Sequence, residues 1–346
     1  MGTIASKHSS SESPSPSEAA VAADSIDQLK AALNNVLFGQ EHLIDMTVVG
    51  LLAGGHILLE GLPGLGKTEL VKGLSKALAL ESKRVQFTPD LLPGDITGNP
   101  VLEEVDGKRQ FTFQRGPIFA NILLADEVNR ASPKTQSAML EAMQERRVTV
   151  MGHTYELPTP FFVLATQNPI ELEGTYPLPE AQLDRFLLKL DVPSNNVHTL
   201  EKIVLHRDIG IEPHVSQVMD GPRLLSLLQL VRRIYMPPTV ANYIARLVQA
   251  SHPGEASADG IKFGASPRAA LALAAAAKAK ALCSKRVNAS YEDVRCIASS
   301  VLRHRIVLDY SAKIEGNTTD LVVERLLEHV PVQEAPLPST LAAAKV

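Results

Sequence analysis

The sequence contains no tryptophan, and aromatic residues make up only 4% of its 346 positions. A chain so poor in aromatic rings offers little surface on which nucleic-acid bases could stack. Positive charge is not in excess either, because 34 lysines and arginines stand against 38 aspartates and glutamates, with a formal net charge of -4. These two deficits argue against nucleic acid as a partner.

Cysteine and long apolar runs are also scarce. The two cysteines, Cys283 and Cys296, form neither a CxxC pair nor a disulfide framework, and we expect both to be buried, reduced thiols in a cytoplasmic protein. The longest apolar run, Ala269 to Ala277, is too short to cross a bilayer. No apolar secretion signal is recognised, so direct membrane insertion is not expected.

Both ends of the chain are predicted to be loose. Residues 1–23 are rich in Ser, Ala, Pro and Glu, a composition that predicts a disordered tail. Residues 1–6 match the short myristoylation pattern, but one acyl chain anchors weakly and no polybasic patch follows, so a flexible tail is the preferred interpretation. Residues 331–346 contain Pro331, Pro336 and Pro338 and are predicted to be a second loose tail.

A glycine-rich segment is the most specific motif that the chain does contain. Residues 61–68 read GLPGLGKT and follow an apolar run of strand length, residues 55–60. Gly64 and Gly66 allow the backbone N–H groups to point at phosphate oxygens, and a helix beginning near Lys67 adds its positive end. Lys67 would neutralise the β- and γ-phosphates, and Thr68 would offer its hydroxyl to Mg²⁺.

This segment therefore predicts a site for a nucleoside triphosphate rather than a glycine-rich turn with an accidental lysine. The expected contacts to the nucleotide are Gly61, Leu62, Pro63, Gly64, Leu65, Gly66, Lys67, Thr68 and Glu69.

The pattern of apolar residues divides the chain into two parts. Residues 24–193 alternate strand-like runs with amphipathic helices, which is typical of a three-layer α/β domain with a mainly parallel sheet. Residues 194–330 are predicted to form a small all-helical domain. The expected strands are Ile57 to Leu59, Val85 to Thr88, Ile122 to Ala125, Phe161 to Ala165 and Leu187 to Asp191. The expected helices of the second domain are Leu200 to Arg207, Arg223 to Ile234, Val240 to Ala250, Arg268 to Leu282, Tyr291 to Arg305 and Thr319 to His329.

Two adjacent carboxylates end the third expected strand. Successive residues of a strand point to opposite sides, so Asp126 and Glu127 can perform different tasks. Asp126 would lie beside Mg²⁺, while Glu127 would polarise the water that attacks the γ-phosphate. Asn168 follows the fourth expected strand and could hydrogen-bond the γ-phosphate or that water; its alternative role is an Asx turn before Pro169.

Two arginines are candidate ligands of the γ-phosphate. Arg185 precedes the last expected strand, where its planar guanidinium could reach a phosphate bound by an adjacent subunit. Its structural alternative is an ion pair with Asp184 or Glu180. Arg268 lies in the first turn of a predicted helix, where a cation opposes the helix dipole; this indicates either an anionic ligand or a solvated surface arginine.

These motifs together resemble those of one known family. The order GLPGLGKT, ILLADEVNRA, ATQNP, LPEAQLDRF and GASPRA is similar to that of the MoxR family of AAA+ ATPases, over about residues 26–329. The resemblance implies Lys67 and Thr68 as Walker A and Asp126 and Glu127 as Walker B. It further implies Asn168 as sensor 1, Arg185 as a trans-acting arginine finger and Arg268 as sensor 2. Residues 36–40, which include Phe38 and Gly39, are similar to the family segment beside adenine.

The resemblance also implies an activity and partners. It implies ATP and Mg²⁺ as ligands and hydrolysis in a homo-oligomeric ring, with a hexamer expected. Chaperone-like remodelling, maturation, or insertion of a cofactor or metal into partner complexes would follow, commonly with a partner that carries a von Willebrand factor A domain. Two alternatives remain open: a nucleotide-gated assembly protein that needs little turnover, and the motor subunit of a metal chelatase.

Two β-hairpins are predicted inside the α/β domain. Residues 101–113 would turn at Asp106 and Gly107, and residues 147–157 would turn near Gly152 and His153. They are either decorative or, as the resemblance implies, the surface that acts on partners. The sequence His206-Arg207-Asp208 imitates a kinase catalytic loop, but it lacks the Asn of that motif and is interpreted as a helix end.

Overall fold

The computed structural model describes residues 13–62, 64–105, 108–169, 174–208, 210–255 and 257–332. Its centre is a parallel sheet of five strands in the order β2-β5-β8-β1-β9. The strands are β1 (Ile57–Glu60), β2 (Ser82–Gln86), β5 (Ile122–Asp126), β8 (Phe162–Gln167) and β9 (Leu188–Asp191). This confirms the predicted sheet, although β2 begins at Ser82 rather than at Val85.

Alternate side chains of the strands enter two separate apolar clusters. Ile57 and Leu59 of β1 pack in one cluster, whereas Leu58 between them packs in the other. Helices α1 (Pro16–Asn34), α2 (Glu41–Leu52) and α3 (Lys67–Leu78) contribute to the first cluster, and α5 (Pro133–Glu145) contributes to the second. The sheet is therefore buried on both faces, which explains why its strands are almost continuously apolar.

Helix α1 corrects the predicted disordered tail, residues 1–23, over residues 16–23. The helix begins at Pro16, after Ser15 as N-cap, and a capping box joins Ser15 to Glu18. Ala19 and Ala22 are buried in the first cluster because their small side chains let α1 pack closely against its neighbours. Residues 1–12, with the myristoylation pattern, lie outside the described residues.

The C-terminal part of the chain is mainly helical. Its helices are α7 (Val197–His206), α8 (Gly221–Arg233), α9 (Pro238–Ala250), α10 (Pro267–Cys283), α11 (Tyr291–Leu302), α12 (Tyr310–Ile314) and α13 (Thr319–His329). This confirms the predicted helical domain, which also contains one short strand pair: β10 (Ile261–Phe263) pairs antiparallel with β11 (Val307–Leu308). Residues 331–332 follow α13, and the rest of the predicted C-terminal tail lies outside the described residues.

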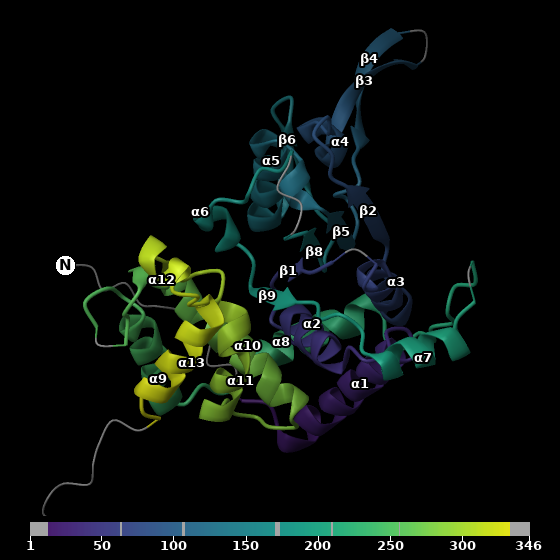
Figure 1. Ribbon diagram of the computed structural model, residues 1–346. Helices are drawn as coiled ribbons and strands as arrows, with labels where there is room; N and C mark the ends of the chain where they lie inside the picture. The colour runs from purple at the N-terminus through teal and green to yellow at the C-terminus, as the bar shows by residue number, and fades with distance from the viewer. Residues whose placement is uncertain are drawn as a thin grey trace, which may run out of the picture.

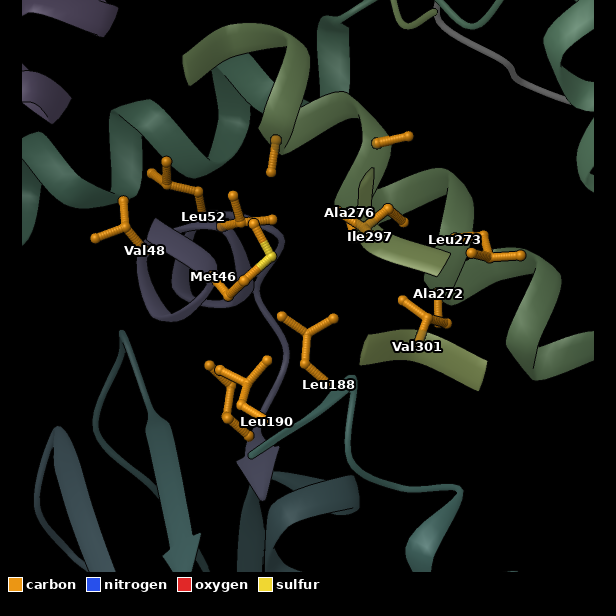
Figure 2. Close-up of a cluster of buried hydrophobic side chains, with 14 of the residues drawn as sticks. Met46, Val48, Leu52, Leu188, Leu190, Ala272, Leu273, Ala276, Ile297 and Val301 are labelled. Carbon is orange, nitrogen blue, oxygen red and sulfur yellow. The ribbon is translucent and has the colours of Figure 1, made fainter. Parts of the chain in front are cut away.

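The helical part shares its core with the sheet. Figure 2 shows side chains of α10 and α11 packed beside side chains of α2 and the edge strand β9. The labelled members are Met46, Val48, Leu52, Leu188, Leu190, Ala272, Leu273, Ala276, Ile297 and Val301. All of them belong to the first apolar cluster, so the helical part is fastened to one edge of the sheet.

Two hairpins leave the sheet domain, as predicted. Strands β3 (Gly98–Val105) and β4 (Lys108–Arg115) form the longer one, which projects away from the body of the molecule in Figure 1. Its expected turn at residues 106–107 lies outside the described residues. Strands β6 (Arg147–Val150) and β7 (His153–Glu156) form the shorter one. The rings of Phe113 and Tyr155 stack with centroids 4.2 Å apart, so the two hairpins contact each other. Short helices α4 (Pro93–Thr97) and α6 (Glu180–Leu183) complete the domain.

The two cysteines differ in exposure. Cys283 is half-buried, and burial raises the pKa of its thiol to about 11. Cys296 is exposed, which corrects the expectation that both thiols are buried. Neither forms a disulfide. Among the helices in the described ranges, none has the length and apolarity that a bilayer crossing requires.

His56, directly before β1, is buried with both ring nitrogens hydrogen-bonded. Its Nδ1 accepts from the N–H of Val163 at 3.0 Å, and its Nε2 donates to the carbonyl of Met143 at 3.2 Å. Burial lowers the pKa of His56 to about 4, so the ring is neutral in the folded protein at neutral pH. The histidine thus joins β1, β8 and the end of α5 in its uncharged form.

We expect the free energy of unfolding to decrease as the pH falls from 6.5 to about 4, because only the unfolded chain binds a proton at His56 in this range. The stability that comes from keeping His56 neutral is fully present above pH 6.5. About 3 kcal/mol of this stability is lost when the pH reaches about 4. Denaturant unfolding at several pH values measures it. Buried His304 also has a lowered pKa, so the difference between the wild type and His56→Gln isolates His56. The same pH dependence in both proteins would contradict this assignment.

Candidate functional site

The glycine-rich loop joins β1 to α3 as the sequence predicts. Gly66 is the N-cap of α3 with φ 83°, and Gly64 has φ 80°, two backbone conformations that favour glycine. A Cβ on Gly66 would lie 2.3 Å from Leu37 Cδ1, whereas a Cβ on Gly64 would meet none of the described residues within 4 Å. The loop thus leaves open space in front of the first turn of α3, where unpaired N–H groups favour an anion.

Lys67 turns its amine back onto this loop. Its Nζ donates to the carbonyl of Gly61 at 2.5 Å. Burial lowers the pKa of Lys67, and the negative charges of Asp126, Glu127 and Glu60 oppose that effect. The ammonium group is therefore half-buried beside carboxylates, where a phosphate can replace the carbonyl of Gly61 as its partner.

Asp126 ends β5 with both carboxylate oxygens engaged. Oδ1 accepts from Thr166 Oγ1 at 2.6 Å, and Oδ2 accepts from Arg84 Nη2 at 2.6 Å. Thr166 is on β8 and Arg84 is on β2, the two strands that flank β5. These contacts fix the orientation of the carboxylate, and its remaining lone pairs suit Mg²⁺, which prefers oxygen ligands.

Glu127 is held in an uncommon backbone conformation. Its φ is 56°, in the left-handed region, and its N–H donates to Thr166 Oγ1 at 2.9 Å. Its Oε2 accepts from Gln86 Nε2 at 2.7 Å and forms an ion pair with Arg130 at 3.0 Å. Strain of this kind persists where the surroundings determine the conformation, which is common at functional sites.

These groups line one hollow of about 350 Å³, which we call the phosphate hollow. Of the predicted residues, it contains Gly61, Gly64, Gly66, Lys67, Thr68, Glu69, Asp126, Glu127 and Asn168. Sequence reasoning missed Arg84, Gln86 and Thr166, which also line it. Arg84 and Gln86 alternate along β2 as Arg-Val-Gln, and this period of two is the signal that could have placed them on one side. Leu62 is exposed outside it, and Pro63 lies outside the described residues.

The phosphate hollow adjoins a second hollow of about 500 Å³, which we call the base hollow. Val36, Leu37, Phe38 and Leu65 line it, and the two hollows share Gly64, Gly66 and Glu69. Arg207, which follows α7, lies with its guanidinium carbon 5.2 Å from the Phe38 ring centroid. The sequence His206-Arg207-Asp208 is a helix end as predicted, and its Arg207 also lines this hollow.

Gly39 has a structural position beside this hollow. A Cβ at Gly39 would lie 2.1 Å from Thr199 Oγ1, and its φ is 68°. The glycine therefore lets the first turn of α7 pack against residues 36–40, and it does not itself line the base hollow.

The two predicted arginines lie elsewhere. Arg185 and Arg268 line a third hollow of about 390 Å³, the arginine hollow, to which Arg146 also contributes. Arg185 donates from Nη1 to the carbonyl of Leu140 at 2.9 Å. Asp184 does not pair with Arg185 but with Arg305, at 2.7 Å, and its Oδ2 is 3.9 Å from Arg268 Nη1. Within one chain, the structure does not bring Arg185 or Arg268 to the phosphate hollow.

The residues present fit a triphosphate and its metal ion. The open space at Gly64 and the first turn of α3 match the phosphates, and the oxygens of Thr68 and Asp126 match Mg²⁺. In the described residues, no group of three or more His, Cys, Asp or Glu could hold a metal ion.

Comparison with known proteins gives consistent matches. Residues 56–188 match the family described as "ATPase family associated with various cellular activities (AAA)", and residues 254–326 match the AAA lid domain. The chain is 42% identical to YeaC of Bacillus subtilis over 309 residues, which are 88% of this chain and 94% of that protein. It is 40% identical to chaperone MoxR1 of Mycobacterium tuberculosis over 307 residues, which are 87% and 81% of the two chains.

A solved structure agrees with these relatives. The crystal structure of a candidate ATPase from Cytophaga hutchinsonii is similar to this chain, with a TM-score of 0.85 and 38% identity. The match covers 92% of this chain and 98% of that one.

Proposed function

Because this chain belongs to the MoxR family of AAA+ ATPases, we propose that it hydrolyses ATP at a site that a second copy of the chain completes, and that it uses the cycle to remodel partner proteins. One observation carries the proposal. The phosphate hollow contains the loop and the carboxylates, but Arg185 and Arg268 lie in a different hollow of the same chain. A head-to-tail neighbour would bring the two halves together.

In this proposal the residues of the phosphate hollow divide the task. The N–H groups of the loop and Lys67 bind the phosphates, and Glu127 accepts a proton from the attacking water. Asn168 orients that water through its amide. The contacts of Glu127 with Gln86 and Arg130 hold its carboxylate in place before ATP binds. Mg²⁺, bound by Thr68 and Asp126, would neutralise charge on the β- and γ-phosphates.

The base hollow supports ATP as the substrate through its apolar walls. A base that enters it would contact Val36, Leu37 and Phe38, beside the guanidinium of Arg207. These contacts would recognise the flat, apolar shape of the base. The choice of adenine over guanine comes from the family membership.

An exposed apolar row supports association with a second copy. Val197, Leu200 and Val204 on α7 are 83%, 49% and 79% exposed, next to the base hollow. Apolar side chains at this spacing share one face of a helix and favour burial against another surface. We propose a homo-oligomeric ring in the cytoplasm, with six copies as the expected number.

The long hairpin supports a role on other proteins. Leu102 of β3 and Phe111 of β4 are paired in register, and they are 52% and 63% exposed on the projecting hairpin (Figure 1). An exposed apolar pair of this kind suits contact with a protein chain. One relative is named a chaperone. We propose that partner complexes are matured or loaded with a cofactor or metal in this way, together with a protein that carries a von Willebrand factor A domain.

Specific activity should rise with protein concentration, because a site shared between copies exists only in the assembled state. The measurement is ATP hydrolysis over a dilution series that extends below the assembly range determined by ultracentrifugation. The activity per chain is expected to fall together with the assembled fraction. A flat specific activity down to the monomer would reject the shared site.

A further inference from the structure

Three arginines from separate segments meet at the arginine hollow. Arg146 follows α5, Arg185 follows α6, and Arg268 is in the first turn of α10. The family resemblance assigns Arg185 the role of arginine finger. It assigns Arg268 the role of sensor 2. Nothing so far accounts for Arg146.

The hollow has an excess of positive charge that its own residues do not neutralise. Asp184 is the one acid in its lining among the described residues, and Arg305 already pairs with it at 2.7 Å. His56, also in the lining, is neutral. None of the ion pairs found in the described ranges includes Arg146 or Arg185, so a ligand with several negative charges would complement this lining.

The backbone at Arg146 is unfavourable for an arginine. The residue caps the C-terminus of α5 with φ 53°, its N–H donates to the carbonyl of Ala142, and its carbonyl accepts from the N–H of Leu157. This left-handed cap position strongly favours glycine. Arg146 is exposed; its guanidinium donates to the carbonyl of Gly54 at 3.3 Å, and both residues line the hollow. A cation at a helix C-terminus is also favourable by itself, and a test must separate that structural role from a functional one.

We propose that Arg146 acts with Arg185 and Arg268 on the polyphosphate chain of ATP bound by the neighbouring copy. The inference rests on the proposed shared site and adds a third contact to it. Three guanidinium groups around one hollow can contact different phosphate oxygens, so the loss of Arg146 leaves two of the three contacts in place.

The test is complementation between two impaired variants. Arg146→Ala keeps its own phosphate hollow but lacks the arginine, while Lys67→Ala lacks the hollow's lysine but keeps Arg146. Arg146→Ala alone should lose about tenfold or more in kcat, a smaller loss than the roughly 10³-fold expected for an arginine finger. Co-assembled with Lys67→Ala, it should regain activity several-fold above the sum of the separate variants. Activity equal to that sum would overturn the proposal.

The same experiment with Arg185→Ala separates this inference from the shared site itself. Recovery with Arg185→Ala but not with Arg146→Ala would reject only the role of Arg146. Recovery with neither variant would reject the shared site and the inference together. Recovery with both would support each of them.

Two further variants exclude a structural explanation. Arg146→Gly suits the left-handed backbone, so its thermal midpoint should stay equal or rise while kcat falls. Full activity of Arg146→Gly would overturn the proposal. Arg147→Ala is the matched control, because Arg147 is the next residue, lines a different hollow and pairs with Glu145 at 3.3 Å. It should hydrolyse ATP at the wild-type rate.

Discussion

Glu127→Gln is expected to slow ATP turnover by about 10²–10⁴-fold while ATP still binds. Glutamine has nearly the same shape and keeps an oxygen that can accept from Gln86 or Arg130. Its amide cannot accept a proton from water, so only the chemical step should be affected. The backbone strain at φ 56° remains in the variant, which keeps the two proteins comparable.

Single-turnover hydrolysis and fluorescent ATP binding measure the two effects separately. Glu141→Gln is a suitable control, because this carboxylate is exposed on α5 and lines a hollow away from the phosphates. Wild-type turnover by Glu127→Gln would reject the assigned base. If Glu127→Gln bound ATP and still supported the cellular task, turnover would be dispensable and the nucleotide-gated alternative would be favoured. Capture of partners by the ATP-bound variant would identify the client.

Arg185→Ala is expected to lower kcat by about 10³-fold or more, with little change in the affinity for ATP. The guanidinium would act on charge that develops in the transition state at a neighbour's site. Within its own chain it donates to the carbonyl of Leu140, and its Nε is buried with no hydrogen-bond partner among the residues that the structure describes. A buried donor without an acceptor is destabilising, which fits a group held for a ligand outside the chain.

Arg185→Lys tests whether the paired N–H donors of the guanidinium are required or whether a positive charge is sufficient. It should recover only a small part of the activity, because lysine cannot bind two oxygens side by side. Thermal unfolding and ultracentrifugation of both variants test whether folding and assembly survive. Wild-type kcat in a folded, assembled Arg185→Ala variant would remove Arg185 from the mechanism.

Local sequence patterns predicted the phosphate hollow well. The loop and the polar ends of β5 and β8 follow from short segments, because parallel strands place their carboxyl ends at one edge. The groups that hold the carboxylates were harder to find. Arg84 and Gln86 lie on an edge strand with exposed polar positions, which by themselves resemble an ordinary solvated face.

The structure differs from the sequence-based predictions in two other places, for reasons that composition and local pattern do not describe. The composition of residues 1–23 favoured disorder, although the capping box at Ser15 and Glu18 was present and starts α1. The first turn of the helix that contains Arg268 was predicted correctly, but the hollow that Arg268 lines could not be, because α10 packs on α2 and β9 through contacts distant in sequence.

The apolar cluster that unites α2, β9, α10 and α11 (Figure 2) has a mechanical consequence. Separating the helices from the edge of the sheet would expose this apolar cluster to water. The free-energy cost would be about 25 cal/mol for each Å² of apolar surface exposed. Each subunit should therefore move as one stiff body. In the proposed ring, the motion that ATP hydrolysis drives would then be a rocking of whole copies at their interfaces. A crosslink inside one copy would leave hydrolysis unaffected, whereas a crosslink between two copies would stop it.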